Sequence, residues 1–418
     1  MSHDVILRDI AGKLPVTPSS RKTLWIGCVV VGLIAFVVLL ATNPLRAWGA
    51  YAINVLFWLG VAMGGVVLSA AIRLCNGHWA GPIQRIGESL SAYLPFGIGS
   101  MAVLLLFGIW TYLPWTKGGA EPRVQAFLNV PFLYIRTLGG LLLFWWLARK
   151  LVKASMRADL QLLKPHVATE LRPVYDKWTG NWRGDREEEA HARHQLAHLS
   201  PQVVLVFVVF FSVMSWDFIM CLTPQWVSGL FGWYCYAGAF LSGVSMVAFI
   251  ASRVRSRYRL EAYITPNHFW DIGKVVFSFC IFWVYLFWSQ YLPIWYANMP
   301  EETWWIFLRF EEPWRTLSFT VFTMIFLIPF LGMMNKTTKS SPFWMMVFTL
   351  LVMSGVWLER HLLVMPSLNP DAVWLGFGEI GVGIGFMGLF GWSVQGFLAR
   401  YPAVKVTDAL AGGGGHGH

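Results

Sequence analysis

Long apolar segments recur along the chain, separated by short polar or turn-forming segments. A helix that crosses the hydrocarbon core of a bilayer needs about 20 apolar residues. Ten segments meet this length: 24–42, 50–75, 91–113, 129–151, 200–222, 229–251, 270–292, 314–334, 342–360 and 374–398. Because helices keep their backbone hydrogen bonds within one segment, they are the natural way for such runs to cross lipid. The pattern therefore predicts an all-α membrane protein with about ten spanning helices.

These segments divide the chain into five parts. We expect a cytoplasmic tail (1–23), helices one to four (24–151), a cytoplasmic loop (152–199), helices five to ten (200–398) and a second cytoplasmic tail (399–418). The loop is rich in charge, and we expect one or two amphipathic helices in it, lying on the membrane surface. The first apolar run is long enough to span, so it is interpreted as a helix and not as a signal peptide.

The orientation follows from the positions of lysine and arginine, which accumulate in cytoplasmic loops. If the N-terminus is cytoplasmic, 24 of the 32 basic residues fall on the cytoplasmic side. The segment 149–193 alone holds ten of them, whereas an opposite loop is acidic, with Glu301, Glu302, Glu311 and Glu312. The sequence thus predicts a multi-pass protein of a bacterial inner membrane type, with both termini in the cytoplasm.

Composition supports lipid as the solvent. Only 13% of the residues are charged and 56% are hydrophobic, whereas a soluble domain carries about 25% charged residues. The net charge of +10 is explained by the cytoplasmic loops. Nucleic-acid binding is disfavoured because the basic runs lie between apolar spans and not on one folded face.

Several kinds of cofactor site are absent from the sequence. The five cysteines form no CxxC or CxxCH spacing, which argues against covalent haem and iron–sulfur clusters. No histidine falls in the middle of a predicted span, as ligands of a membrane haem would. There is no ATP-binding P-loop sequence, and we expect no metal site. The spacing of His416 and His418 would suit weak metal binding, but a glycine-rich end is more commonly an unstructured tail.

A few ionisable residues fall inside the predicted spans, where they are costly and often functional. The expected orientation puts His268, Asp271 and Lys274 near the cytoplasmic mouth. The outer half would hold Arg136, Asp217 and Glu379, together with the run 359–361. Asp271 and Lys274 are three apart on a helix and are expected to pair. Such groups either brace the bundle as salt bridges or pass protons, and the sequence leaves both interpretations open.

Glycines surround Glu379 at Gly376, Gly378, Gly381 and Gly383. They would allow close helix packing or leave room for water or a ligand ring. Aromatic residues near the outer mouth could line a quinone pocket or form an interfacial belt. These candidates are Trp216, Trp226, Trp374 and Phe377, with His361 beside them.

Two stretches resemble a known family. The run 215–228, SWDFIMCLTPQWVS, is followed by Phe231-Gly232-Trp233-Tyr234, and the run 287–303 reads FWSQYLPIWYANMPEET after Asp271-Ile272-Gly273-Lys274. Both resemble the ActF-type subunits of bacterial alternative complex III, which belong to the NrfD-like family of membrane anchors. The ten-span layout extends the likeness over the chain, although the first third matches in topology only.

The resemblance implies a fold of largely two four-helix bundles plus two further helices. It implies a quinol:cytochrome c (or other acceptor) oxidoreductase of the respiratory chain, with menaquinone or ubiquinone as substrate of the complex. The implied partners are multi-haem cytochromes, an iron–sulfur subunit, an ActC-type subunit, a terminal oxidase and lipids. The ActF-type subunit itself has no redox centre and is thought to assist proton conduction.

Three hypotheses follow for the function. The first is a cofactor-free subunit that stabilises the complex and offers polar half-paths for protons. The second is a purely structural anchor. The third is a secondary transporter, which is disfavoured because the two halves show no matched pair of interrupted helices.

Overall fold

The computed structural model describes residues 3–14, 19–118 and 125–412. Within them there is no β-strand, and ten helical segments are long and apolar enough to cross a membrane. These are α2 (Ser19–Thr42), α3 (Pro44–Leu74), α4–α6 (Gly81–Tyr112), α7 (Val130–Leu163), α9 (Asp185–Phe218), α10 (Phe231–Arg257), α11 (Pro266–Ala297), α13–α14 (Arg315–Gly332), α16 (Pro342–Leu368) and α17 (Phe377–Leu398). The predicted all-α membrane fold is confirmed.

Two of these spans are interrupted by changes in helical pitch. The third span contains α4 (Gly81–Ser89), η2 (Leu90–Tyr93), α5 (Leu94–Val103), a π-helical turn η3 (Leu104–Gly108) and α6 (Ile109–Tyr112). The eighth contains α13 (Arg315–Phe322), a π-helical turn η7 (Thr323–Leu327) and α14 (Ile328–Gly332). Such turns insert one residue into the helix and are frequent at functional sites.

Short helices connect the spans. They are α1 (His3–Gly12), η1 (His78–Ala80), η4 (Pro114–Lys117), η5 (Thr169–Leu171), α8 (Arg172–Thr179), η6 (Met220–Leu222), α12 (Pro300–Phe310), α15 (Lys336–Ser340) and α18 (Val406–Gly412). The segment expected as a loop over 152–199 contains α8. It also contains the C-terminal end of α7 and the N-terminal part of α9. Arg123, expected on the outer side, and the two tail histidines lie outside the described residues.

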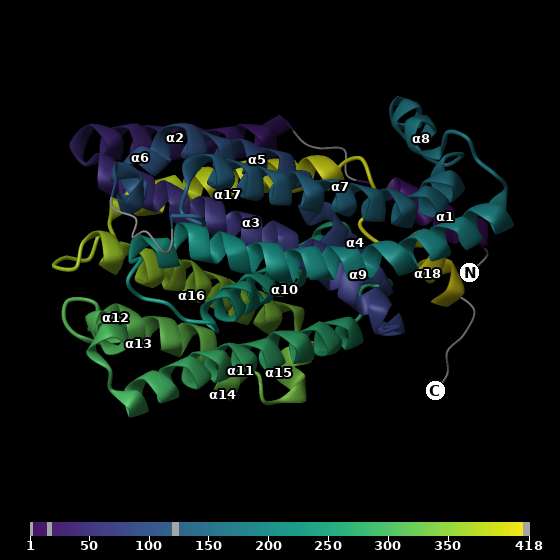
Figure 1. Ribbon diagram of the computed structural model, residues 1–418. Helices are drawn as coiled ribbons and strands as arrows, with labels where there is room; N and C mark the ends of the chain where they lie inside the picture. The colour runs from purple at the N-terminus through teal and green to yellow at the C-terminus, as the bar shows by residue number, and fades with distance from the viewer. Residues whose placement is uncertain (1–2, 15–18, 119–124, 413–418) are drawn as a thin grey trace.

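The spans form two groups of four (Figure 1). One group contains α3, α4–α6, α7 and α9, and the other contains α10, α11, α13–α14 and α16. The groups meet along α3 and α10, while α2 and α17 pack on each other and on α3. This arrangement agrees with the two bundles plus two helices that the resemblance implies.

Glycine lets the central helices approach closely. A Cβ atom added at Gly243 of α10 would lie 2.6 Å from the backbone carbon of Gly64 on α3. A Cβ at Gly385 of α17 would lie 2.7 Å from the Cα of Gly32 on α2. Backbones in direct contact are typical of small residues at helix interfaces in membranes.

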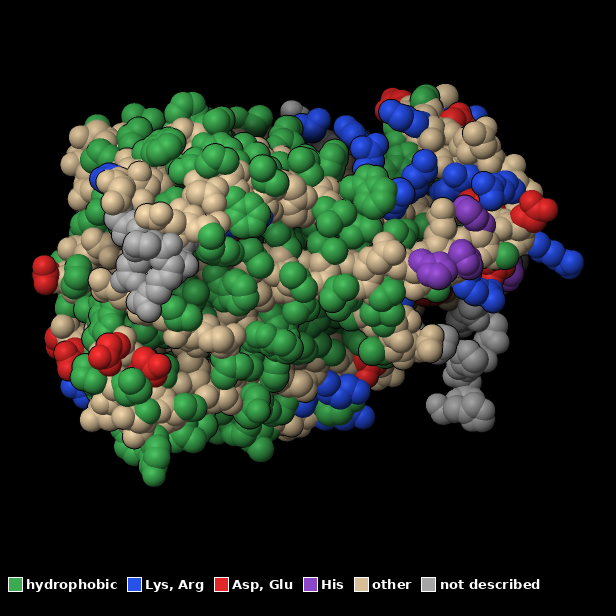
Figure 2. Space-filling model, viewed as in Figure 1, with side chains coloured by type: hydrophobic (Ala, Val, Ile, Leu, Met, Phe, Trp, Pro, Cys, Tyr) green, Lys and Arg blue, Asp and Glu red, His purple; other side chains and the backbone are tan. Residues whose placement is uncertain are grey.

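The two ends of the bundle differ in charge. Both described chain ends, α1 and α18, lie at the same end as α8 (Figure 1). Figure 2 shows most of the lysine, arginine and histidine side chains of this face gathered there, and acidic side chains at the opposite end. We call the first the terminal end and the second the acidic end. The separation matches the charge asymmetry of the sequence.

Replacing Gly243 by alanine should destabilise the bundle, because the added methyl group collides with the α3 backbone. Overpacking of this kind costs about 1–3 kcal/mol, so the apparent melting temperature in detergent should fall. Gly139 of α7 is the matched control, since a Cβ there meets nothing within 4 Å. Gly139→Ala should leave the melting temperature unchanged or raise it, because alanine favours helix. Equal effects of both variants would contradict the contact.

Candidate functional site: two layers of buried charge

A network of four charged side chains, three of them buried, lies near the terminal end. Arg73 donates from Nη2 to Glu88 Oε1 at 2.5 Å, and Arg85 donates from Nη1 to Glu88 Oε2 at 2.5 Å. Arg85 also donates from Nη2 to Asp159 Oδ2 at 2.5 Å. Glu88 and Asp159 are at most 1% exposed. Two guanidinium groups thus neutralise two carboxylates, and this pairing offsets the free-energy cost of burying them.

The C-terminal helix docks on this network. The backbone N–H of Thr407 donates to Asp159 Oδ1 at 3.0 Å. Asp408 lies against the N-terminus of α4, where a Cβ atom on Gly81 would fall 2.1 Å from its Oδ2. A carboxylate is stabilised at this position by the unpaired N–H groups and the dipole of the helix. The chain end is therefore held onto the buried charges.

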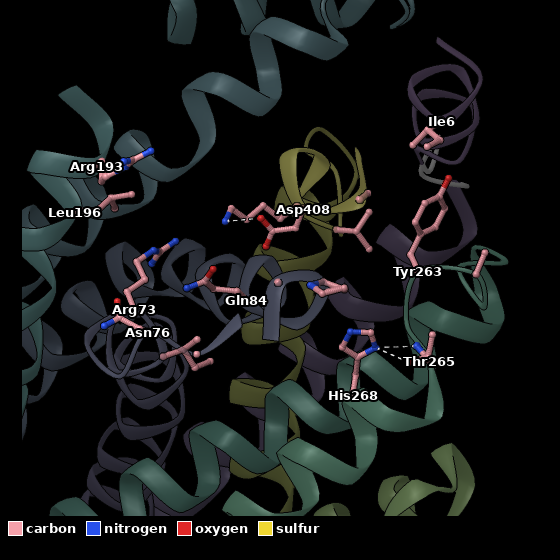
Figure 3. Close-up of a pocket in the computed structure, with 18 of the residues that line it drawn as sticks. Ile6, Arg73, Asn76, Gln84, Arg193, Leu196, Tyr263, Thr265, His268 and Asp408 are labelled. Atoms are coloured by element: carbon pink, nitrogen blue, oxygen red, sulfur yellow. Dashed lines mark hydrogen bonds and ion pairs between the residues drawn. The ribbon is translucent and has the colours of Figure 1, made fainter. Parts of the chain in front are cut away.

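A cavity of about 1460 Å³ opens beside the network. We call it the vestibule; residues of α1, α3, α4, α9, α18 and the start of α11 line it. Figure 3 shows Arg73 and Arg193 across the cavity from Tyr263 and His268. Arg73 belongs both to the lining and to the network, because it binds Glu88. Gln84 of the lining donates to the Ser69 carbonyl at 3.0 Å, and the Ser69 hydroxyl donates to Glu88. The vestibule thus leads from the surface to a buried carboxylate.

A small polar cluster fastens α1 over the vestibule. Asp9 Oδ2 accepts from Lys13 Nζ at 2.7 Å and from the Tyr263 hydroxyl at 2.8 Å. Partial burial by itself would raise the pKa of Asp9, but the hydrogen bonds from Lys13 and Tyr263 outweigh it and hold that pKa below its usual value. Burial and the neighbouring carboxylate raise the pKa of Tyr263 to about 12, so the phenol remains a donor at neutral pH.

The predicted inner residues lie close to the vestibule but outside the network. Asp271 and Lys274 pair at 2.7 Å as expected, and the Lys274 side chain is half exposed. His268 lines the vestibule and accepts at Nδ1 from the backbone N–H of Thr265 at 3.0 Å. The buried charge at this depth therefore belongs to Glu88 and Asp159, which sequence reasoning missed.

The second layer lies toward the acidic end. Arg136 donates from Nε and Nη2 to the two oxygens of Asp217 at 2.8 and 2.5 Å, and from Nη1 to the Phe127 carbonyl at 2.7 Å. The guanidinium also stacks over the Phe127 ring at 3.9 Å. Two parallel donors to one carboxylate fix both side chains. The sequence had placed both residues in the outer half without identifying them as partners.

Glu379 is likewise paired, with a residue that the sequence did not single out. Arg46 at the start of α3 donates through Nε and Nη2 to its two oxygens, the second at 2.9 Å. The Gly376 N–H also donates to Glu379 Oε2 at 2.9 Å. Two of the glycines around Glu379 pack against α2, because added Cβ atoms at Gly378 and Gly381 would collide with Leu39 and Ala35. They serve close packing, the first of the two roles considered for them.

Glu359 and Arg360 form a buried charged pair that leaves hydrogen-bonding atoms unsatisfied. Glu359 Oε1 accepts from Trp283 Nε1 at 2.9 Å, but Oε2 lies 3.6 Å from Arg360 Nη1. Arg360 Nη2 donates to the Cys235 carbonyl at 2.8 Å. Glu359 Oε2 and Arg360 Nη1 are buried without a hydrogen-bond partner among the described residues. Spare hydrogen-bonding capacity of this kind is where buried water or a mobile proton is accommodated.

His361 continues this cluster toward α17. Sequence reasoning had ended the ninth span at residue 360, whereas α16 continues to Leu368 and buries His361 within it. Its Nδ1 lies 3.1 Å from the Trp357 carbonyl, and its Nε2 has no described partner. No histidine was expected in the middle of a predicted span, and the longer α16 places His361 inside this span, before its end at Leu368.

Between the two layers the polar side chains are sparse. Asn54 lies at the depth of the second layer and Ser69 at that of the first, about 22 Å apart along α3 at 1.5 Å per residue. The buried hydroxyls of Ser242 and Thr349 donate to carbonyls of their own helices. Ser245 Oγ is buried without a partner among the described residues. The described side chains thus form two separate polar regions.

The aromatic residues suggested for a quinone pocket do not converge. Phe377 is 97% exposed, whereas Trp226 is buried and stacks on Trp305 with ring centroids 3.9 Å apart. An aromatic cavity of about 560 Å³ lies instead between α11, α12, α13 and α16. Its lining includes Tyr234, Trp283, Phe287, Trp305, Arg309 and Phe322. Trp283 therefore faces the cavity and binds Glu359 with the same ring.

Comparisons with known proteins add no relative. A scan against protein-family models found no matching family, and a search of curated proteins found no match. The functional interpretation therefore rests on the residues and on the resemblance described above.

Replacing Asp217 by asparagine should destabilise the protein strongly, because Arg136 would keep its charge without a counter-ion. Breaking a buried pair costs about 3–5 kcal/mol, which a melting curve in detergent would detect. The double variant Arg136→Met/Asp217→Leu should recover most of the loss, since it removes both charges. As a control, Arg193→Met breaks the exposed pair with Glu189 and should change little. No recovery in the double variant would contradict the pairing.

Proposed function

We propose that this chain is the cofactor-free, ActF-type membrane subunit of a quinol:cytochrome c (or other acceptor) oxidoreductase in a bacterial inner membrane. The termini would be cytoplasmic. Its partners would be multi-haem cytochromes, an iron–sulfur subunit, an ActC-type subunit and a terminal oxidase, with lipid around them. The observation that carries the proposal is buried charge at two depths of one bundle, with the inner layer beside a large cavity that Arg73 and Gln84 line. Paired charges would also brace a passive anchor, but an anchor has no need of a cavity that leads to them.

The inner half-path would begin at the vestibule. Water entering this cavity reaches Gln84 and Arg73 directly, and Arg73 binds Glu88. This route replaces the Asp271–Lys274 pair as the central element of the inner path, because that pair lies outside the vestibule lining. His268 stays at the entrance.

The outer half-path would centre on Glu359. In Asp217 and in Glu379, both carboxylate oxygens accept hydrogen bonds from a single arginine. These two residues are therefore better suited to bracing helices than to exchanging protons. Glu359 keeps one carboxylate oxygen without a hydrogen bond. A general base needs an accessible lone pair near the proton it accepts. Quinol oxidation releases protons together with electrons, and a free carboxylate nearby could receive them.

The decisive experiment has two stages. The chain is first purified in mild detergent, where the proposal predicts co-migration with multi-haem and iron–sulfur proteins. A monomer that purifies without these proteins would instead favour a secondary transporter. In the second stage, Glu359→Gln is compared with Asp217→Asn and Glu379→Gln in the purified complex reconstituted into vesicles.

Glu359→Gln keeps the hydrogen bond from Trp283 but removes the counter-ion of Arg360, so its melting temperature should fall as in Asp217→Asn and Glu379→Gln. Only Glu359→Gln should also lower the number of protons moved per electron, measured per assembled complex. A purely structural anchor predicts no change in proton yield for any assembled variant. Wild-type proton yield in an assembled Glu359→Gln complex would refute the relay.

Quinone binding by this subunit is a second candidate, favoured by the aromatic cavity. The cavity has an apolar ring-lined wall, and Trp283 connects it to Glu359. Arg309, buried at its edge, has no carboxylate within 4.0 Å among the described residues and donates to the carbonyls of Leu362 and Leu363. A neutral quinone ring with acceptor oxygens suits this apolar, ring-lined cavity with its buried arginine better than an anionic lipid does. The acidic side chains at residues 301, 302, 311 and 312, which flank α12, would repel an anionic headgroup.

A photoreactive quinone should label peptides of residues 283–310, and unlabelled quinone should compete. Phe322→Trp would fill the cavity and should reduce labelling severalfold. Phe96→Trp, on an exposed aromatic of α5, is the control and should not. Labelling that phospholipid displaces equally well, or that Phe322→Trp leaves unchanged, would assign the cavity to an ordinary acyl chain.

A further inference from the structure

The N-terminal half of α9 carries a row of histidines outside the two charged layers. His191, His194 and His198 occur at spacings of three and four, so they share one side of the helix. His194 and His198 are exposed, and Figure 2 shows histidine side chains gathered at this end of the molecule. Neither the proposed proton paths nor the quinone cavity uses them.

The geometry of this pair is that of two ligands to one ion. The Nε2 atoms of His194 and His198 lie 3.2 Å apart, and the ring centroids are 4.5 Å apart. Zinc binds imidazole nitrogen at about 2.0–2.1 Å in a tetrahedral arrangement, which places two such nitrogens about 3.3–3.4 Å from each other. The rings therefore need almost no movement to accept a metal ion between them.

A hydrogen bond between the two rings would give a similar distance. One imidazole would then donate its Nε2 proton to the other, and a metal ion would have to displace that proton. Both rings lie at the surface, so water can carry this proton from Nε2 to Nδ1 of the same ring, which keeps the ring neutral and frees its Nε2 lone pair.

We propose that His194 and His198 form a surface site for a divalent transition-metal ion that prefers imidazole, such as Zn²⁺, Cu²⁺ or Ni²⁺. Water completes the coordination, because among the described residues no group of three or more potential ligands is arranged around one ion. The site lies beside the vestibule, since Arg193, Leu196 and Ala197 of the same helix turn line that cavity.

The test uses the full chain in detergent with His416 and His418 replaced by alanine, so that the tail histidines do not compete. Zn²⁺ is titrated against a fluorescent chelator at pH 7.5, and we expect one ion per chain. His194→Ala and His198→Ala should each weaken binding at least tenfold, because each removes half of the protein ligands. Gln195→Ala, an exposed change on the same turn, is the control. His191→Ala should have a smaller effect.

Binding should also weaken at acidic pH, because protons compete with the ion for both imidazole nitrogens. With Cu²⁺, electron paramagnetic resonance should report two nitrogen ligands in the parent chain and one in either single variant. All variants should retain the parent's elution profile and helix content, because the residues are exposed. Equal Zn²⁺ affinity in the parent and both histidine variants, or a Cu²⁺ spectrum without paired nitrogens, would overturn the site.

Discussion

A carboxylate buried in a helix bundle within lipid is tolerable only beside a positive charge, because its hydration is lost and little else replaces it. The buried carboxylates among the described residues are Glu88, Asp159, Glu188, Asp217, Glu359 and Glu379, and each has an arginine within 4.0 Å. Arginine suits this role better than lysine, since its planar group binds both oxygens and is more weakly hydrated.

Most of these pairs connect different helices. Arg73 joins α3 to α4, Arg85 joins α4 to α7, Arg136 joins α7 to α9, and Arg46 joins α3 to α17. Glu359 and Arg360 are the exception, because they are adjacent on α16 and neighbours in sequence do not face each other on a helix. Their separation of 3.6 Å follows from that constraint. This pair joins no two helices and keeps spare hydrogen-bonding atoms, as does the pair of Arg157 and Glu188 between α7 and α9, where Glu188 Oε2 has no described partner.

What the sequence predicted correctly depends on short-range pattern. Ten apolar runs, the charge asymmetry and the i,i+3 pairing of Asp271 with Lys274 need no knowledge of tertiary contacts. The partner of Glu379 could not be found this way, because Arg46 is more than 300 positions away and looked like an ordinary loop residue. The end of α16 was placed too early, since Glu359, Arg360 and His361 interrupt hydropathy although they are buried. The network of Glu88 was missed because α4 begins before the apolar run at residue 91.

The close contact between α3 and α10 stabilises the bundle and also separates the two proposed proton half-paths. Gly64 and Gly243 lie between the two charged layers, and their backbones approach too closely to admit a methyl group. Water, which is larger than the gap that such a contact leaves, is excluded along this line. A continuous aqueous path would dissipate the proton gradient that a respiratory complex maintains. Two polar half-paths that end on either side of a glycine-sealed contact avoid that loss, so the packing that stabilises the bundle would also insulate its two sides.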